Sequence, residues 1–279
     1  MANVWNAMKK HQAESGSQPP PEASSAATTG AVSATTMTAP APVAPMSSQQ
    51  SVDQVKGKGY SPLLMAYHDR GGKVTEEYRA LRTNLLAQCN DRKFCYLVTS
   101  SQPEEGKTIT CLNLGIVMTE RVDRRTVIVD CDLRKGTAAK LLGAEPNPGV
   151  AEVLRGQATL KDVVQATALP NLFFIPTGKA DAHEVGEIMG RLELDELVEQ
   201  LRRQFDYVLF DTPPVNIASD AGMLGKATGE ALLVVRMNKT HRESVDRAMA
   251  LLHAANVRPV GIILTHQKFH IPNYLYRYS

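Results

Sequence analysis

The sequence predicts an α/β fold in which a doubly wound, mainly parallel sheet carries helices on both faces. Short apolar runs typical of strands alternate with longer helical segments, as in βαβ units. These runs are continuously apolar, which is expected of strands buried on both faces. One run leads through a loop of phosphate-binding composition into a helix.

The expected elements begin with a helix over residues 76–89, in which apolar residues recur at helical spacing. The strands are predicted at 94–99, 126–131, 172–176, 207–211, 232–236 and 260–264. The other long helices are predicted at 108–119, 187–205 and 242–255.

Composition divides the 279 residues into three parts. Ala, Pro, Ser and Thr make up 29 of the first 50 residues, and no Phe, Tyr, Ile or Leu occurs there. Such a segment cannot bury enough apolar area to offset its ordering entropy, so residues 1–58 are expected to be a disordered leader. Residues 59–265 are predicted to form one domain, and residues 266–279 a flexible tail that contains tyrosines.

Charge and cysteine content exclude several classes of protein. The net charge of +2 gives no electrostatic argument for nucleic acid. The four cysteines lack CxxC spacing, so buried thiols in a reducing compartment are expected, with a metal or disulfide framework as the alternative. No apolar stretch approaches the roughly 18 residues of a membrane span, and the N-terminus lacks an apolar signal core. We therefore expect an intracellular protein that only a partner could hold at a membrane.

Residues 101–108 (SQPEEGKT) fit the P-loop pattern, so the predicted fold is of the P-loop NTPase type. Backbone N–H groups of such a loop point at phosphate oxygens; Lys107 would reach the β and γ phosphates, and the Thr108 hydroxyl would ligate Mg²⁺. Glu104 and Glu105 are unusual in a loop that holds anions, and glycine is more usual at 104; we expect both side chains to point to solvent. The predicted nucleotide-binding residues are Gln102, Pro103, Glu104, Glu105, Gly106, Lys107, Thr108, Ile109 and Arg134.

Three carboxylates are expected at the carboxyl edge of the sheet, where ligands of open α/β sheets lie. Asp130 and Asp132 follow one strand at a spacing that places them on the same side of an extended chain. Asp211 ends another strand, as a Walker-B carboxylate does. Thr108, Asp132 and Asp211 are the predicted Mg²⁺ ligands, and Asp130, then Asp132, is the predicted proton acceptor. The alternatives are a helix-capping Asp130 with a solvated Asp132, and a plain strand-end Asp211.

Two further features lie outside this edge. Tyr274, Tyr276 and Tyr278 fall in the last six residues, either as exposed acceptors on a mobile tail or as part of an edge strand. Glu76, Arg79 and Arg82 are spaced by threes and form one charged ridge of a helix. This ridge is either a solvated face or a self-association surface that meets acidic groups of a neighbour.

Together these motifs resemble the bacterial tyrosine kinases (BY-kinases), the cytoplasmic tyrosine autokinases of capsule and exopolysaccharide export. The resemblance rests on the loop at 101–108, the segments 127–134 and 208–214, the Glu-x-x-Arg-x-x-Arg pattern at 76–82 and the terminal tyrosines. Gly136 stands where the family often has proline. Thr265-His266 ends the last strand where the family commonly has an Asn that helps to recognise adenine, so no residue is assigned to adenine.

The resemblance implies a protein-tyrosine autokinase that uses ATP and Mg²⁺. Lys107, Asp130 and Asp132 would be catalytic, the terminal tyrosines would be the acceptors, and the activity would regulate polysaccharide chain length and export. The resemblance also implies a ring-like homo-oligomer formed through helix 76–82. The other implied partners are the cytoplasmic segment of a membrane chain-length regulator and a phosphotyrosine phosphatase. The chain would then be cytoplasmic and held at the inner face of the plasma membrane by its partner.

Two other functions remain open. A partitioning or positioning ATPase would share this fold, but its loop carries an extra lysine that would fall near Gln102. A degenerate nucleotide-binding scaffold without phosphoryl transfer is the third, motivated by Glu104 and Thr265.

Overall fold

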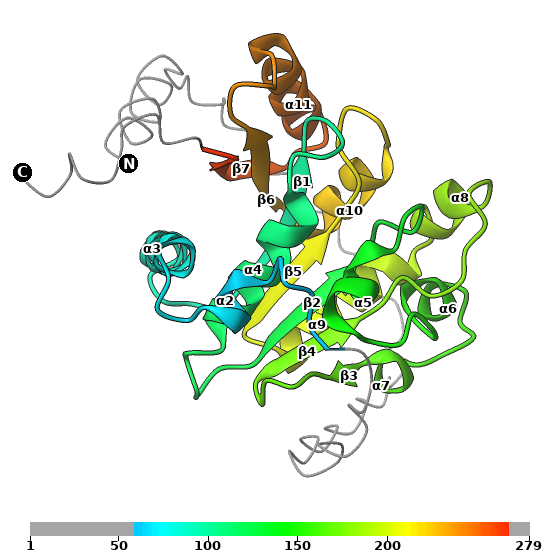
Figure 1. Ribbon diagram of the computed structural model, residues 1–279. Coiled ribbons are helices and arrows are strands. Elements are labelled where there is room, and N and C mark those ends of the chain that lie inside the picture. The colour runs from blue at the N-terminus through cyan, green and yellow to red at the C-terminus, as the bar shows by residue number, and fades with distance from the viewer. Residues whose placement is uncertain (1–58, 268–279) are drawn as a thin grey trace, which may run out of the picture. The chain divides into compact units, whose positions relative to one another are not determined.

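A mainly parallel sheet forms the centre of the computed structural model, which describes residues 59–267. Within these residues the sheet has seven strands in the order β3-β4-β2-β5-β1-β6-β7, and only the β3–β4 pair is antiparallel. The ends of the sheet are β3 and β7 (Figure 1). The strands are β1 (Phe94–Ser100), β2 (Thr126–Asp130), β3 (Gln165–Ala166), β4 (Leu172–Ile175), β5 (Tyr207–Asp211), β6 (Glu230–Arg236) and β7 (Arg258–Thr265).

Helices cover both faces of the sheet, which confirms the predicted fold class. Alternate residues of β1 show this: Cys95 and Leu97 pack into one apolar cluster, and Phe94, Tyr96 and Val98 into the other. The helices are α2 (Met65–His68), α3 (Lys73–Gln88), α4 (Lys107–Met118), α5 (Thr137–Leu142), α6 (Val150–Leu154), α7 (Leu160–Val163), α8 (Val185–Met189), α9 (Glu193–Gln204), α10 (Asp220–Thr228) and α11 (Arg242–Ala254).

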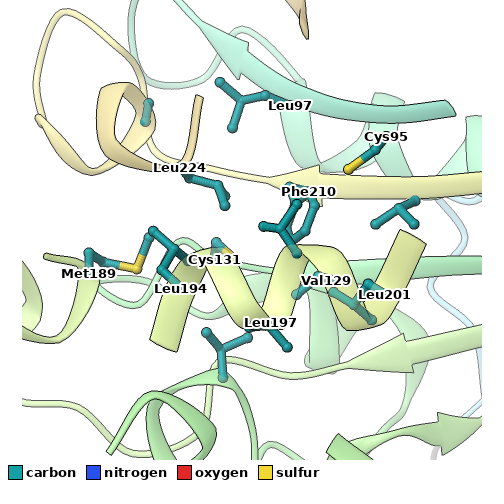
Figure 2. Packing of buried hydrophobic residues seen from close by; sticks show 14 of the residues in the cluster. Cys95, Leu97, Val129, Cys131, Met189, Leu194, Leu197, Leu201, Phe210 and Leu224 are labelled. Carbon is teal, nitrogen blue, oxygen red and sulfur yellow. The ribbon is translucent and has the colours of Figure 1, made fainter. Parts of the chain in front are cut away.

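Helix α9 shows how one face is closed. Leu194, Leu197 and Leu201 recur at helical spacing, and all three are buried. Figure 2 shows them in the cluster that contains Val129 of β2 and Phe210 of β5. Burying each such side chain contributes roughly 1.5–3 kcal/mol. The polar residues of α9 lie on the opposite face, so the helix packs against the sheet with one face only.

The predicted single helix over 187–205 is wrong, because the structure has two helices there. Helix α8 ends at Met189 and α9 begins at Glu193. Gly190 caps the first helix, and its N–H donates to the carbonyls of Gly186 (3.1 Å) and Glu187 (3.2 Å). Glycine disfavours a helix interior by roughly 1 kcal/mol relative to alanine, so the break falls at this residue.

The cysteines are free thiols, as expected. Cys95, Cys111 and Cys131 are buried, and Cys89 is partly buried. Burial raises the pKa of the Cys95 thiol to about 12. Across residues 59–267, no helix combines the length and apolarity that crossing a bilayer requires. The division into leader, domain and tail stays a prediction, since residues 1–58 and 268–279 lie outside the described part of the chain.

Candidate active site at the carboxyl edge of the sheet

The loop between β1 and α4 is built around two residues in the left-handed region. Gly106 has φ 91° and precedes the first turn of α4, where a side chain would be strained. Glu104 has φ 62°, which costs a residue other than glycine roughly 1–2 kcal/mol. Its side chain is 77% exposed and lies 3.7 Å from Lys239. The left-handed backbone at position 104 explains why glycine is more usual there. The expectation that the Glu104 side chain points to solvent is confirmed.

Glu105 does not point to solvent, and that expectation is wrong. The residue is 2% exposed, and its carboxylate accepts hydrogen bonds from the Ser101 hydroxyl (3.0 Å), the Gln102 N–H (2.8 Å) and the Thr240 hydroxyl. The Thr265 hydroxyl also donates to the Glu105 carbonyl at 2.6 Å. The loop thus folds a carboxylate inward because Ser101, Gln102 and the distant Thr240 supply the donors that a buried acceptor needs.

The first residue of α4 joins the loop to the carboxylates. The Lys107 Nζ lies 2.9 Å from Asp132 Oδ2, 3.8 Å from Asp211 Oδ1 and 3.2 Å from the Thr108 Oγ1. Burial alone would lower the pKa of Lys107, but the charges of Asp211 and Asp132 outweigh it, so the pKa is raised. The ammonium therefore stays charged at this edge.

The three predicted carboxylates do come together. Asp130 and Asp211 are register partners at the ends of the parallel strands β2 and β5. Both are fully buried, and Asp132 is 2% exposed. A solvated Asp132 is therefore wrong. Burial and the charge of Asp211 raise the pKa of Asp130 well above its ordinary value, and burial raises that of Asp211 to about 6.

Asp130 is held by the backbone that follows it. Its carboxylate accepts hydrogen bonds from the N–H groups of Asp132 (3.1 Å) and Ala138 (3.1 Å). Ala138 lies in the first turn of α5, so Asp130 also caps this helix, as the alternative interpretation expected. Capping and proton acceptance are compatible, because a carboxylate has about four lone-pair sites.

The donor set fits Mg²⁺. Both carboxylate oxygens of Asp211 are buried and have no hydrogen-bond partner among the described residues, which is costly unless a cation pairs with them. The Thr108 hydroxyl and Asp132 lie around the same ammonium. Within residues 59–267, no group of three or more His, Cys, Asp or Glu side chains is arranged to hold a metal. Mg²⁺ needs no such cluster, since it is bound through one or two carboxylates, waters and substrate phosphates.

Other predicted residues have partners away from the lysine. The Arg134 guanidinium donates to Asp220 at 3.1 and 3.3 Å, and the Gln102 side chain donates to the Ser244 hydroxyl at 2.8 Å. Their roles at the nucleotide stay predictions. The Thr240 and Thr265 donors around Glu105 were missed because they lie 135 and 160 residues away in the chain.

The predicted self-association ridge has a partner within the same chain. The Arg79 guanidinium donates to Glu120 at 2.6, 2.8 and 3.1 Å and also contacts Glu76. Arg82 contacts Glu120 and donates to the Val117 carbonyl at 2.6 Å. The ridge therefore ties α3 to the end of α4, and its contact with a neighbour stays a prediction. The predicted acceptors Tyr274, Tyr276 and Tyr278 lie outside the described residues.

Known proteins match this chain over most of the described residues. The family model for an AAA domain matches residues 104–240. A tyrosine-protein kinase of Acinetobacter johnsonii is 30% identical over 217 residues, which are 77% of this chain and 29% of that protein. The tyrosine-protein kinase YwqD of Bacillus subtilis is 29% identical over 195 residues, which are 70% of this chain and 81% of that protein. The chain thus spans less than a third of the Acinetobacter protein.

Solved structures share the architecture. The kinase domain of the Escherichia coli tyrosine kinase ETK matches with a TM-score of 0.70 and 26% identity, over 81% of this chain and 89% of that one. The cell division ATPase MinD of Pyrococcus furiosus matches with a TM-score of 0.54 and 26% identity, over 62% of this chain and 71% of that one. The P-loop NTPase-like fold predicted from the sequence is confirmed.

Proposed function

The chain is a homologue of the bacterial tyrosine kinases, as its motifs predicted, and we propose that it is itself an ATP-dependent protein-tyrosine kinase. The observation that carries the proposal is the meeting of Lys107, Asp130, Asp132 and Asp211 at one edge of the sheet. Phosphoryl transfer from a nucleotide requires a lysine that binds the phosphates and carboxylates that hold the metal ion or orient the nucleophile.

Each residue has a distinct part in this proposal. The loop amides and Lys107 hold the β and γ phosphate oxygens, while Thr108, Asp132 and Asp211 hold Mg²⁺, which neutralises phosphate charge when bound. Asp130 accepts the proton of the tyrosine hydroxyl. Its raised pKa makes it a stronger base than an ordinary aspartate. Because tyrosine has a pKa of about 10, positioning and charge neutralisation supply most of the acceleration.

The acceptors and partners in this proposal follow the family. Tyr274, Tyr276 and Tyr278 receive the phosphoryl group, and helix α3 takes part in a ring-like homo-oligomer. A cytoplasmic segment of a membrane chain-length regulator activates the kinase at the inner face of the plasma membrane, and a phosphatase reverses the reaction. Exopolysaccharide or capsule chain length and export are the processes it would regulate.

An anti-phosphotyrosine blot of the purified full chain, with and without Mg·ATP, tests the proposal. We expect a signal only with Mg·ATP, and its loss in Lys107→Met, because no other ammonium contacts Asp132 within residues 59–267. Lys161→Met is the matched control, since Lys161 is exposed on α7. Full phosphorylation of Lys107→Met would rule out the assigned lysine.

The remaining outcomes separate the other functions. ATP turnover without phosphotyrosine would indicate a partitioning or positioning ATPase. Nucleotide binding without turnover would indicate a scaffold. Replacing the three tail tyrosines by Phe should remove most of the signal, and a persistent signal would place the acceptors elsewhere.

A further inference from the structure

A cleft of about 660 Å³ opens next to the candidate active site. One wall is the segment 133–136, which continues directly from Asp132, and the other is the segment 177–181, which follows β4. A volume of this size accommodates a large side chain together with its neighbours. The cleft is therefore placed where a polypeptide could reach the carboxylates.

The wall that follows β4 is fixed by close backbone packing against helix α6. The Val150 N–H donates to the Pro176 carbonyl and the Ala151 N–H to the Thr177 carbonyl, both at 2.9 Å. A Cβ on Gly149 would lie 2.1 Å from the Pro176 carbonyl oxygen, so helix α6 approaches this wall as closely as the backbone allows. The cleft is thus formed by ordered segments of the fold.

The charge of the cleft is positive and partly uncompensated. Arg134 is paired with Asp220, and Arg155 is paired with Glu184 at 2.5 Å. Lys135 and Lys179, one on each wall, are exposed and have no ion pair within residues 59–267. Asp181 also lines the cleft without an ion pair, so the unpaired side chains among these described residues are two positive and one negative. A ligand that brings negative charge between these two ammonium groups would be favoured.

The chain's own tail does not match this charge. Residues 266–279 contain no Asp or Glu, and they carry Lys268 and Arg277. The complement of the cleft is instead a segment with acidic residues next to its tyrosine. A segment of another protein with such a composition would match the cleft.

On the basis of the proposed function, we propose that this cleft binds acceptor polypeptides that differ from the chain's own tail in carrying acidic residues beside the tyrosine. Lys135 and Lys179 select acidic residues beside that tyrosine, so the substrates include acidic segments of other proteins. In the step itself, the tyrosine oxygen bonds to the γ phosphorus, the bond to the β–γ bridging oxygen breaks, and ADP leaves. The tyrosine proton passes to Asp130.

Peptide kinetics with the full chain and Mg·ATP test this inference. Three peptides of equal length carry one tyrosine in a Gly/Ser background and differ only in two flanking residues, which are Glu, Gln or Lys. We expect kcat/KM to fall in that order, by about threefold to tenfold at each step, because each exposed ion pair is weak. The preference should shrink as ionic strength rises.

Variants that reverse the charge of the cleft test the inference more strictly. In Lys135→Glu/Lys179→Glu the order should invert, so that the Lys peptide becomes the best substrate. Lys135→Ala/Lys179→Ala should level the three peptides if the reversed variant does not fold. The control Lys140→Glu/Lys161→Glu changes two exposed lysines outside the cleft and should keep the wild-type order.

The two proposals fail in different ways. Absence of phosphotyrosine on the wild-type chain and on every peptide would overturn the proposed function. Phosphorylation of all three peptides at one rate would overturn the inference and leave the kinase activity standing. An acidic preference that survives in both cleft variants would also overturn it.

Discussion

Replacing Asp211 by Asn should stabilise the protein when metal and nucleotide are absent. Asp211 is fully buried, neither of its carboxylate oxygens accepts a hydrogen bond from a described residue, and its nearest cation is Lys107 at 3.8 Å. Such a carboxylate is unfavourable to the folded chain whenever it is ionised. Asn keeps the shape of the side chain and removes the charge.

The size of the effect follows from the pKa of Asp211. Burial raises it from 3.8 to about 6, so the folded chain holds this proton at pH values where the unfolded chain has released it. Stability therefore falls as pH rises from about 4 to about 6 and then stays level. The difference in pKa corresponds to roughly 3 kcal/mol at pH 8 and to about half of that at pH 5.

Urea denaturation at pH 5 and pH 8, with EDTA present, measures this difference between wild type and Asp211→Asn. Asp123→Asn is the control, because the Asp123 side chain is 64% exposed. A second arm adds Mg·ADP, which should stabilise the wild type and should give much less to Asp211→Asn. The reasoning would be refuted by a variant that is less stable than wild type at pH 8, or by an equal difference at both pH values.

Two further predictions concern residues that the sequence interpretation placed differently or left without an assigned partner. Glu105→Ala leaves the Gln102 N–H and two hydroxyls without their buried acceptor, so the free energy of unfolding should fall by about 2–3 kcal/mol. The control Glu104→Ala changes an exposed side chain and should alter the free energy of unfolding little. Equal effects of the two variants in urea denaturation would contradict the assigned hydrogen bonds. Glu120→Ala removes the carboxylate that Arg79 and Arg82 share, at a cost below about 1 kcal/mol, while Arg79 keeps its contact with Glu76. A ring formed through this ridge should then assemble at lower protein concentration in sedimentation velocity; weaker assembly would show that a neighbour recognises the ridge with Glu120 in place.

Much of the sheet could be predicted because its strands are continuous apolar runs. The expected strand 207–211 coincides with β5, and the bounds of β1, β2, β4, β6 and β7 differ from prediction by one or two residues. The short strand β3 and the helices α2, α5 to α7 and α10 were not predicted. All of them except the nine-residue α10 have two to six residues, which carry too little periodicity. Tertiary packing decides where such short elements form.

Part of the candidate site could likewise be predicted from the sequence, and part could not. Carboxylates at strand ends could be predicted to meet, because parallel strands share one carboxyl edge. The inward turn of Glu105 could not, because its partners Ser101, Gln102 and Thr240 come together only when β6 and α11 are in place. The intrachain partner of the arginine ridge, Glu120, was equally hidden, since it lies beyond the end of another helix.

The position of Lys107 ties the two ligands of the proposed reaction to each other. Its ammonium is the counterion of Asp132 and Asp211, and the phosphates of a nucleotide would compete for that same ammonium. A nucleotide that bound alone would therefore draw the Lys107 ammonium away from the two buried carboxylates. A divalent cation that bound alone would be repelled by the ammonium beside those carboxylates. With both bound, Lys107 would lie beside the phosphates and the cation beside the carboxylates, so each of these buried charges would have a neighbour of opposite sign. Binding of nucleotide and cation would accordingly be cooperative and reciprocal.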